Sequence, residues 1–402
     1  MAHAKPRVCV VGPSTRFLSG ITYYTYSLCT GLNEHFTVST ILMRRLLPAR
    51  FYPGSARVGK ALTTMALPPS VRRYDGVDWF WFPSLFGAAR FLIQQRPSVL
   101  ILQWWTGTVL HTYLVLAVLA RLLGITVVIE FHEVLDPGED SMKWVARYVR
   151  LVGPRLFALA SGFVVHSAFD RALIRRTFGD TRTPIEIIPH ATYGQYRKGS
   201  VPSRNESAPR GAPPKCCNLL YFGLIRPYKG VEDLIRAFDA IPDDEIDAYW
   251  LTIAGETWEG YTLPAQLIAQ SRHGARITFI NRYVTDEEVD GLFGGADVVV
   301  LPYYRASQSG TLHVALHYGL PVVVTEVGGL VEAVEGYEGA VLTQPGNPPI
   351  LLDAIRKAAA LRGRTFPNPR NWADTGDRYK DFLARLEVFA HRRPRKSERR
   401  GG

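Results

Sequence analysis

Short runs of apolar residues alternate along the chain with longer stretches in which apolar residues recur at helical spacing. The short runs predict buried strands, and the periodic stretches predict helices packed against them. Because strand and helix alternate in both halves, the pattern predicts parallel α/β domains. The expected strands span residues 7–11, 36–42, 99–103, 126–131, 162–166, 185–188, 218–222, 250–254, 277–280, 298–301, 321–325 and 339–342. The expected helices span residues 21–32, 109–123, 151–159, 169–177, 231–240, 286–293, 311–318 and 372–390.

Two segments interrupt the alternation and divide a chain that is too long for one ordinary core. Residues 44–73 are basic and rich in proline, so a long loop with short helices is expected there. Residues 197–215 are rich in Ser, Pro, Gly and charge, which is typical of a linker. The predicted fold is α/β, with two Rossmann-like doubly wound parallel-sheet domains facing each other across a cleft. The expected divisions are residues 1–196, a linker at 197–216, a second domain at 217–370, a helix at 371–390 that is long enough to leave the second domain, and a basic disordered tail at 391–402.

One strand-to-helix turn in the second half has the composition of an anion site. Ser309, Gly310 and Thr311 follow a buried strand and precede a helix. The first backbone N–H groups of a helix are unpaired and carry partial positive charge, and glycine lets the backbone approach a phosphate closely. An ordinary turn of an α/β domain is the alternative interpretation.

A second loop supplies cations. Gly223 follows the first strand of the second domain, and Arg226 and Lys229 precede the next helix. Two cations in such a loop can bind a diphosphate and stabilise the charge that develops on it as a leaving group. For an isolated pair, two solvated charges would be the commoner case. In a parallel sheet, however, this loop is expected to lie opposite the Ser309–Thr311 turn.

Charge and cysteine content limit the kinds of ligand and the cellular compartment that fit the sequence. Lys and Arg exceed Asp and Glu by 11, and residues 391–402 hold six basic residues against one acid. This balance suits a phosphorylated ligand, an anionic membrane surface or nucleic acid. The four cysteines show neither metal-ligand nor disulfide spacing, and no signal peptide or membrane span is recognised, so a cytoplasmic setting is expected. Peripheral contact with the inner face of a membrane stays open, with the basic tail as one candidate for it.

Several of these segments resemble one family, the retaining glycosyltransferases of family 4, which have the GT-B architecture. Residues 222–238 (FGLIRPYKGVEDLIRAF) resemble its phosphate-clamp loop and helix, and residues 319–334 (GLPVVVTEVGGLVEAV) resemble its nucleotide-binding region. Residues 187–193 (IIPHATY) are similar to the strand end before its interdomain linker. Residues 371–383 (NWADTGDRYKDFL) are similar to its C-terminal crossover helix.

The resemblance implies transfer of a sugar from a UDP- or GDP-sugar to a glycan, glycolipid or other acceptor, with retention and with neither metal nor cofactor. By match to the family's motifs, Arg226 and Lys229 bind the donor diphosphate, although the arginine is displaced along the loop. Gly20 matches the glycine that lets the first domain close over the donor. His132 matches a histidine near the reacting sugar or acceptor, and a structural histidine is the alternative.

The chain departs from the family at two glutamates, which would contact the donor sugar and the ribose. Their positions fall on Ala306 and Val314. Gln308 and the Ser309–Thr311 turn remain to bind the donor, and Glu326 is expected either to contact a hydroxyl or to be a surface acid. With no paired catalytic carboxylates, serine triad or zinc-ligand cluster in the sequence, front-face attack is the expected course. The expected catalytic residues are His132, Arg226 and Lys229; the expected donor-binding residues are Gly20, Gly223, Gln308, Ser309, Gly310, Thr311 and Glu326.

Two other kinds of function stay open. A nucleotide-sugar epimerase or a phosphorylase would keep the architecture and change the reaction. A non-catalytic binder of anionic surfaces, acting through the basic tail, would be a different class of protein. For the transferase, the expected partners are the nucleotide sugar and a glycan or lipid-linked acceptor, with no nucleic acid. The acceptor is expected to meet the basic and aromatic stretch at residues 44–81, which contains Phe51, Tyr52, Tyr74, Trp79 and Trp81.

Overall fold

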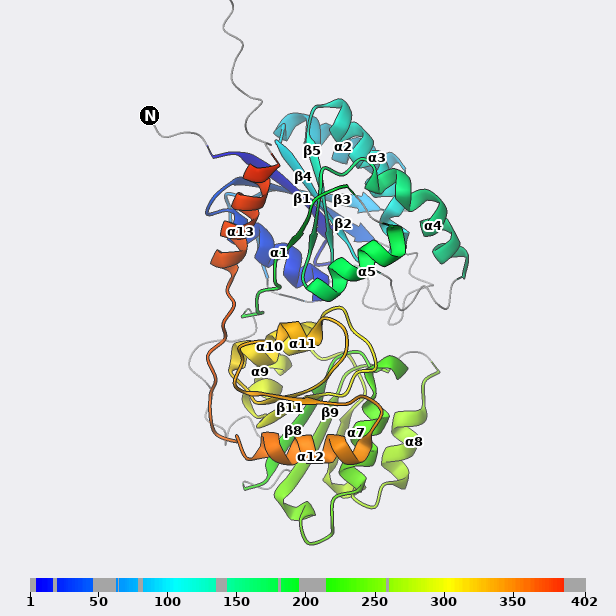
Figure 1. Ribbon diagram of the computed structural model, residues 1–402, viewed down its shortest axis with the longest axis vertical. Helices are drawn as coiled ribbons and strands as arrows, with labels where there is room; N and C mark the ends of the chain where they lie inside the picture. Colours follow the sequence, from blue (N-terminus) through cyan, green and yellow to red (C-terminus); the bar gives the residue numbers. More distant parts are fainter. Residues whose placement is uncertain are drawn as a thin grey trace, which may run out of the picture.

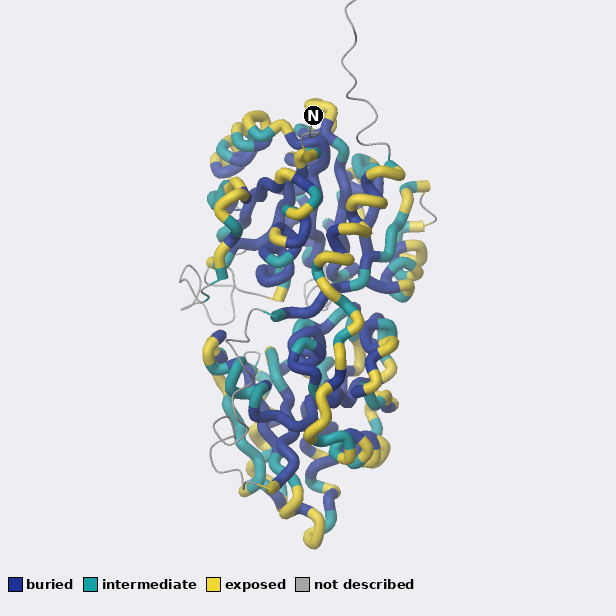
Figure 2. Tube along the Cα trace, turned by 90° about the vertical axis from the view of Figure 1, so that its left-hand side faces the viewer, coloured by how far each residue is buried: buried dark blue, intermediate teal, exposed yellow. Residues whose placement is uncertain are grey.

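The protein folds into two α/β domains stacked end to end (Figure 1). Each domain has a buried interior built on its sheet (Figure 2). The architecture is seen in a computed structural model, which describes residues 5–16, 20–45, 63, 65–78, 82–134, 143–179, 182–194, 215–257 and 260–386.

The first sheet has seven parallel strands in the order β3-β2-β1-β4-β5-β6-β7. The central strands are mostly apolar and buried on both faces, as parallel sheets covered by helices require. Its strands are β1 (Arg7–Pro13), β2 (Thr37–Arg45), β3 (Arg72–Asp78), β4 (Val99–Trp104), β5 (Thr126–Phe131), β6 (Gly162–Val165) and β7 (Ile185–Ile187). The described helices of this domain are α1 (Gly20–Leu32), α2 (Pro83–Gln95), α3 (Leu110–Leu122), α4 (Lys143–Phe157) and α5 (Ala168–Phe178).

The second sheet has six parallel strands in the order β10-β9-β8-β11-β12-β13. Both orders reverse direction beside their first strand, so each domain has the switch point at which doubly wound sheets bind ligands. Its strands are β8 (Cys217–Phe222), β9 (Tyr249–Ala254), β10 (Ile277–Ile280), β11 (Val298–Leu301), β12 (Val322–Thr325) and β13 (Ala340–Thr343). The helices that follow are α7 (Val231–Asp239), α8 (Leu263–Gln270), α9 (Asp286–Gly294), α10 (Gly310–Tyr318), α11 (Leu330–Ala333), α12 (Pro348–Ala359) and α13 (Trp372–Arg385).

The last helix, α13, returns to the first domain and packs against α1 (Figure 1). The packing is close: a Cβ added at Gly31 of α1 would lie 3.0 Å from the carbonyl oxygen of Trp372. The Trp372 indole N–H donates a 2.8 Å hydrogen bond to the carbonyl of Thr192, which lies near the end of the first domain. The chain therefore crosses between the domains twice. The expected two-domain fold with a crossover helix is confirmed.

The structure corrects three expectations. The region expected to be a loop up to Arg73 ends in β3, and α2 follows it at Pro83–Gln95. Neither element was expected. β3 (RRYDGVD) gave no signal because it is an edge strand with no apolar run. Helix α4 begins at Lys143, eight residues before the start expected at 151. Helix α12 lies in a stretch for which no helix was expected.

Candidate functional site

The loop after β8 positions the two predicted cations. Gly223 has φ +117°, a backbone conformation that glycine adopts most readily. A Cβ there would lie 3.2 Å from Thr311 Oγ1 and 3.4 Å from Lys229 Nζ. Arg226 directly precedes a short 3₁₀ turn that ends at Lys229. The glycine thus lets the cationic loop and the start of α10 approach each other.

The Ser309–Thr311 turn begins α10. The Ser309 hydroxyl caps the helix by accepting a 3.3 Å hydrogen bond from the Leu312 N–H. The Thr311 hydroxyl donates a 3.0 Å bond to the Phe222 carbonyl, at the end of β8. This bond joins the helix start directly to the strand that carries the cationic loop, so the two predicted loops are adjacent.

A small hollow lies between these two loops and the first domain. Lys229 contributes its ammonium group, which stands 5.2 Å from the centre of the Tyr303 ring. Glu133, just after β5, is the first domain's contribution to the lining. A lysine beside a helix N-terminus provides donors and positive charge for a phosphate. The lining residues are Glu133, Tyr228, Lys229, Tyr303, Arg305, Ala306, Gln308, Ser309 and Gly310.

Charges around the hollow act on Lys229 in opposite directions. Burial lowers the pKa of Lys229 below its ordinary value, and the neighbouring Arg226 charge acts the same way. The Glu133 carboxylate acts to raise the pKa of Lys229. An incoming dianion would add negative charge next to the ammonium ion and favour its charged form.

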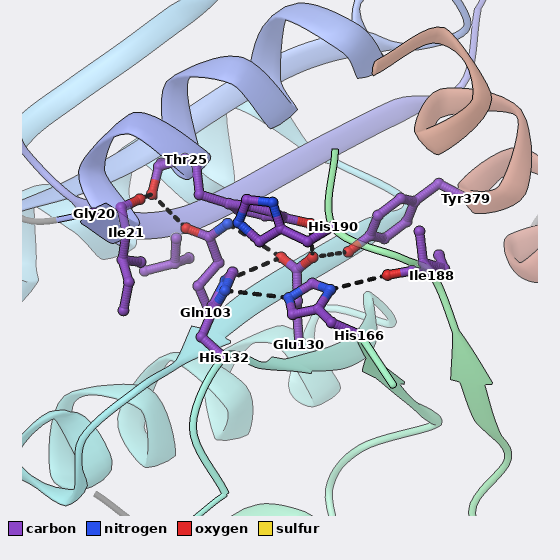
Figure 3. A network of polar contacts seen from close by, with 12 residues as sticks. Gly20, Ile21, Thr25, Gln103, Glu130, His132, His166, Ile188, His190 and Tyr379 are labelled. Atoms are coloured by element: carbon purple, nitrogen blue, oxygen red, sulfur yellow. Dashed lines mark hydrogen bonds and ion pairs between the residues drawn. The ribbon is translucent and has the colours of Figure 1, made fainter. Parts of the chain in front are cut away.

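A buried polar network lies in the first domain, around the strand that precedes Glu133 (Figure 3). At its centre is the Glu130 carboxylate, on β5, which is fully buried. It accepts hydrogen bonds of 2.6 Å from each of the Tyr24 and Tyr379 hydroxyls. The Gln103 amide donates a third bond of 3.1 Å. These three donors compensate the cost of burying a carboxylate.

His166 after β6 and Ile188 after β7 orient His132, which follows β5. The Ile188 carbonyl accepts from His166 Nδ1 at 2.9 Å, so this nitrogen carries the proton. In the neutral pair, His166 Nε2 then accepts from His132 Nδ1 at 3.2 Å. His132 Nε2 is left unprotonated, 3.8 Å from a Glu130 oxygen. Burial, together with neighbouring His166, holds the pKa of His132 well below its ordinary value.

Glu130, His132 and His166 are also the described residues best placed to hold a metal, because potential ligand atoms of all three lie within 4.8 Å of one another. The carboxylate already accepts three hydrogen bonds, and both ring nitrogens of His166 are engaged. A metal would have to replace several of these bonds. The arrangement therefore fits a hydrogen-bond network better than a metal centre.

Side chains from both domains close the cleft around the site. The His190 and His313 rings stack with centroids 3.9 Å apart. The Tyr23 hydroxyl donates a 2.5 Å bond to Asp286. The Glu332 carboxylate accepts from the first two N–H groups of α5, at 2.6 and 2.9 Å. The described conformation is thus one in which the two domains touch.

The structure brings together most of the predicted site residues, but not all. Lys229, Gln308, Ser309 and Gly310 line the hollow, and Gly223 and Thr311 join its two loops. Arg226 precedes the same turn without lining the hollow. Three predicted residues lie elsewhere: His132 is buried and does not line the hollow, Gly20 is at the exposed start of α1, where its carbonyl accepts from the Tyr193 hydroxyl, and Glu326 is exposed after β12.

Sequence reasoning missed Glu133, Tyr303 and Arg305 in the lining. Each follows the carboxyl end of a strand, the one signal that could have identified them. It also missed Glu130 and the buried histidines His166, His190 and His313, because their role depends on contacts between distant segments. The aromatic residues Phe51, Tyr52, Trp79 and Trp81 and the tail at 391–402 lie outside the described residues, and Tyr74 packs against Phe91 of α2.

Two families of known proteins match the chain, each over one of its two domains. Residues 19–191 match the glycosyl transferase 4-like domain, and residues 216–360 match the glycosyl transferases group 1. GDP-mannose:glycolipid 4-beta-D-mannosyltransferase of Xanthomonas campestris pv. campestris is 35% identical over 187 residues, 42% of this chain and 49% of that protein. D-inositol 3-phosphate glycosyltransferase of Rhodococcus jostii is 29% identical over 216 residues, 52% of this chain and 47% of that protein. The chain spans about half the length of the curated relatives it matches.

Solved structures share the fold over nearly the whole chain. Sucrose-phosphate synthase of Thermosynechococcus elongatus superposes with a TM-score of 0.63 at 16% identity, covering 96% of this chain and 97% of that one. Anabaena HepE in complex with UDP and glucose superposes with a TM-score of 0.62 at 15% identity, covering 94% and 100%. At these identities the likeness establishes the GT-B fold and nothing further.

Proposed function

Because the chain belongs to the glycosyltransferases of the family 4 type, we propose that it transfers a hexosyl group from a nucleoside-diphosphate sugar to an acceptor hydroxyl. The observation that carries this proposal is the hollow between Lys229 and the Ser309–Gly310 helix start. It supplies an ammonium group, backbone N–H groups and a helix dipole around one point. A diphosphate is the group such a point binds best.

In the proposed complex the donor's diphosphate lies at this hollow. Lys229, supported by Arg226, pairs the charge that develops as the nucleoside diphosphate leaves. We assign to Gln308, Ser309 and Thr311 the contacts with phosphate or sugar oxygens. Gly20 and Glu326 keep the family-based roles of closure and hydroxyl contact as proposals. No metal is required, because protein donors balance the leaving charge.

The first proposed course is retention by front-face attack. The acceptor oxygen bonds to the anomeric carbon on the face from which the phosphate oxygen departs, and that oxygen receives the acceptor's proton. The protein then needs only to position both substrates, pair charge and exclude water. His132, which burial keeps neutral, retains its family-based role near the reacting sugar or acceptor as a proposal.

A second course, inversion, is favoured by one observation: Glu133 brings a carboxylate from the first domain to the hollow. As general base it would take the proton of the acceptor hydroxyl while that oxygen attacks opposite the leaving diphosphate. The Xanthomonas relative is named for a β-mannosyl product, so a β linkage is within reach of this kind of chain. NMR of the product's anomeric proton distinguishes the two courses.

We propose a glycan or lipid-linked sugar as the acceptor, used at the cytoplasmic side of a membrane with peripheral contact. The name of the Xanthomonas relative specifies a glycolipid acceptor, which supports this class. Within the part of the chain that the structure describes, no helix has the length and apolar character to cross a bilayer.

Thermal-shift measurements with a panel of UDP- and GDP-sugars test the proposal. We expect one donor to raise the melting temperature of the wild type, and Lys229→Ala to remove that rise because the diphosphate loses its cation. Lys357→Ala, which removes an exposed lysine of α12, is the matched control and should keep the rise. No shift with any donor, or an equal shift in Lys229→Ala, would refute the proposed site. Product analysis with labelled donor then separates transfer from epimerisation or phosphorolysis.

A further inference from the structure

Helices α2, α3 and α4 form one side of the first domain, opposite α1 and α13 (Figure 1). Helix α3 packs against both α2 and α4. Their inner faces cover the sheet with buried residues such as Leu92, Leu116 and Leu156. Their outer faces are what this side of the protein presents to its surroundings.

These outer faces carry an unusual number of exposed apolar side chains. Leu122 is 79% exposed, Phe86 77% and Leu151 61%. Ile93 on α2 and Val115 and Val118 on α3 are also exposed. Every large exposed apolar residue found in the described part of the first domain lies on these helices or their caps. Soluble proteins rarely gather so many on one side unless something covers them.

The same helices are strictly cationic. They contain no Asp or Glu, and the sequence has no acid at all from residue 79 to residue 129. Arg90, Arg121, Arg147 and Arg150 are exposed beside the apolar residues. Among the described residues none of these four guanidinium groups has a carboxylate partner. We call this surface, with its six apolar residues and four arginines, the α2–α4 face.

We propose that the α2–α4 face docks on an anionic lipid bilayer, its apolar side chains entering the interfacial region and its arginines meeting lipid phosphates. Apolar residues flanked by unpaired basic residues are the combination that binds anionic interfaces. A second copy of the chain is a poorer occupant. A twofold contact through this face would place arginines against arginines, with no acid on either side to pair them.

The inference deepens the proposed function, on which its biological meaning rests, because docking would hold the enzyme where a lipid-linked acceptor is presented. The face and the cleft belong to the same domain: α4 is the helix that follows β5 and Glu133 of the hollow. The face shares no residue with the hollow. Membrane binding and donor binding can therefore be changed independently.

Flotation of the full chain with vesicles of zwitterionic lipid, with and without anionic phosphatidylglycerol, tests the proposal. We expect binding only to the anionic vesicles, weakening as salt rises. Arg147→Glu/Arg150→Glu should weaken binding about tenfold or more. Phe86→Ser/Leu122→Ser should also weaken binding to the anionic vesicles. Both double variants should fold normally, because the substituted side chains are exposed. The matched controls are Arg378→Glu/Lys380→Glu on α13 and Leu342→Ser/Ile350→Ser in the second domain, and both should bind like the wild type.

Unchanged flotation of both face variants overturns the proposal, as does loss of flotation only on deleting residues 391–402. A concentration-dependent dimer in sedimentation, abolished by the face variants, would overturn it in favour of a second copy. The donor-induced thermal shift of the same variants is read in parallel. If the face variants lose flotation and keep the donor-induced thermal shift, both proposals are supported. If the wild type floats but shows no thermal shift with any donor, the role of the α2–α4 face is supported and the proposed function is refuted.

Discussion

Tyr379 of α13 donates a 2.6 Å hydrogen bond to Glu130 of β5, although the two residues are separated by most of the chain. Both side chains are fully buried. The carboxylate's other donors, Tyr24 and Gln103, belong to the first domain. The last helix thus completes the hydrogen bonding of a charge that the first domain alone would leave less well compensated.

Tyr379→Phe should lower the free energy of unfolding by about 2 kcal/mol, because a buried carboxylate loses one of its donors. Chemical denaturation at neutral pH measures the loss. Tyr148→Phe on α4 is the control: this side chain is only partly buried, so the loss of its hydroxyl should cost less than about 0.5 kcal/mol. Equal effects of the two substitutions would show that the bond to Glu130 contributes nothing to stability.

Gly223→Ala should impair donor binding, since the added methyl group would press on Thr311 and Lys229. Gly336→Ala is a close control, because Gly336 also has a positive φ, +77°, yet a Cβ there meets no atom within 4 Å. Both variants should lose about 1 kcal/mol or more of stability through backbone strain. Only Gly223→Ala should lose the donor-induced thermal shift. A normal shift in that variant would contradict the adjacency of the two loops.

Burial, with Arg370 and His166, lowers the pKa of His313 from 6.5 to about 3. Its folded-state pKa is depressed, so its contribution to stability is complete above the unfolded-state pKa and is lost as pH falls below about 6.5. The loss should approach about 1.4 kcal/mol per pH unit until the pH nears the folded-state pKa. Denaturation of wild type and His313→Gln at pH 7 and pH 5 tests this. Subtracting the variant removes the opposite contribution of Asp170, whose pKa burial raises to about 6.

Glu133→Gln separates the two proposed courses. If Glu133 is the general base of an inverting transfer, kcat should fall by about 100-fold or more while the donor-induced thermal shift persists. If the reaction proceeds by front-face retention, the fall should be much smaller. Glu338→Gln, which changes an exposed acid before β13, should leave kcat unchanged. A large fall together with a retained anomeric configuration would contradict both descriptions of Glu133.

Most of the fold could be predicted because its strands are apolar runs of ordinary length. β5 and β11 were expected at the residue bounds that the structure has. β3 was not predicted, because it is an edge strand and its sequence, RRYDGVD, contains no apolar run. The parallel arrangement of both sheets follows from the alternation of strand and helix, whereas the return of α13 to the first domain was expected only through the family resemblance.

The same distinction between local patterns and long-range contacts applies to the residues of the site. The Ser309–Thr311 turn and Lys229 could be found because each is a local pattern: a strand, a short loop and a helix start. Glu130 could not, because nothing beside it in sequence indicates that two tyrosines and a glutamine will surround it. Glu133 lay next to a residue that was singled out, His132, and the choice between them depended on which side chain reaches the hollow. Only the packing of β5 against its neighbours decides that.

The double crossing of the chain has a mechanical consequence. Two tethers, one after β7 and one before α13, leave the domains far fewer ways to separate than a single linker would. Little orientational entropy remains to be lost when they come together, so a few polar bonds such as those of Glu332 suffice to hold them. Any opening of the cleft is therefore restricted to rotation about these two connections, and the domains do not have to find each other again by diffusion.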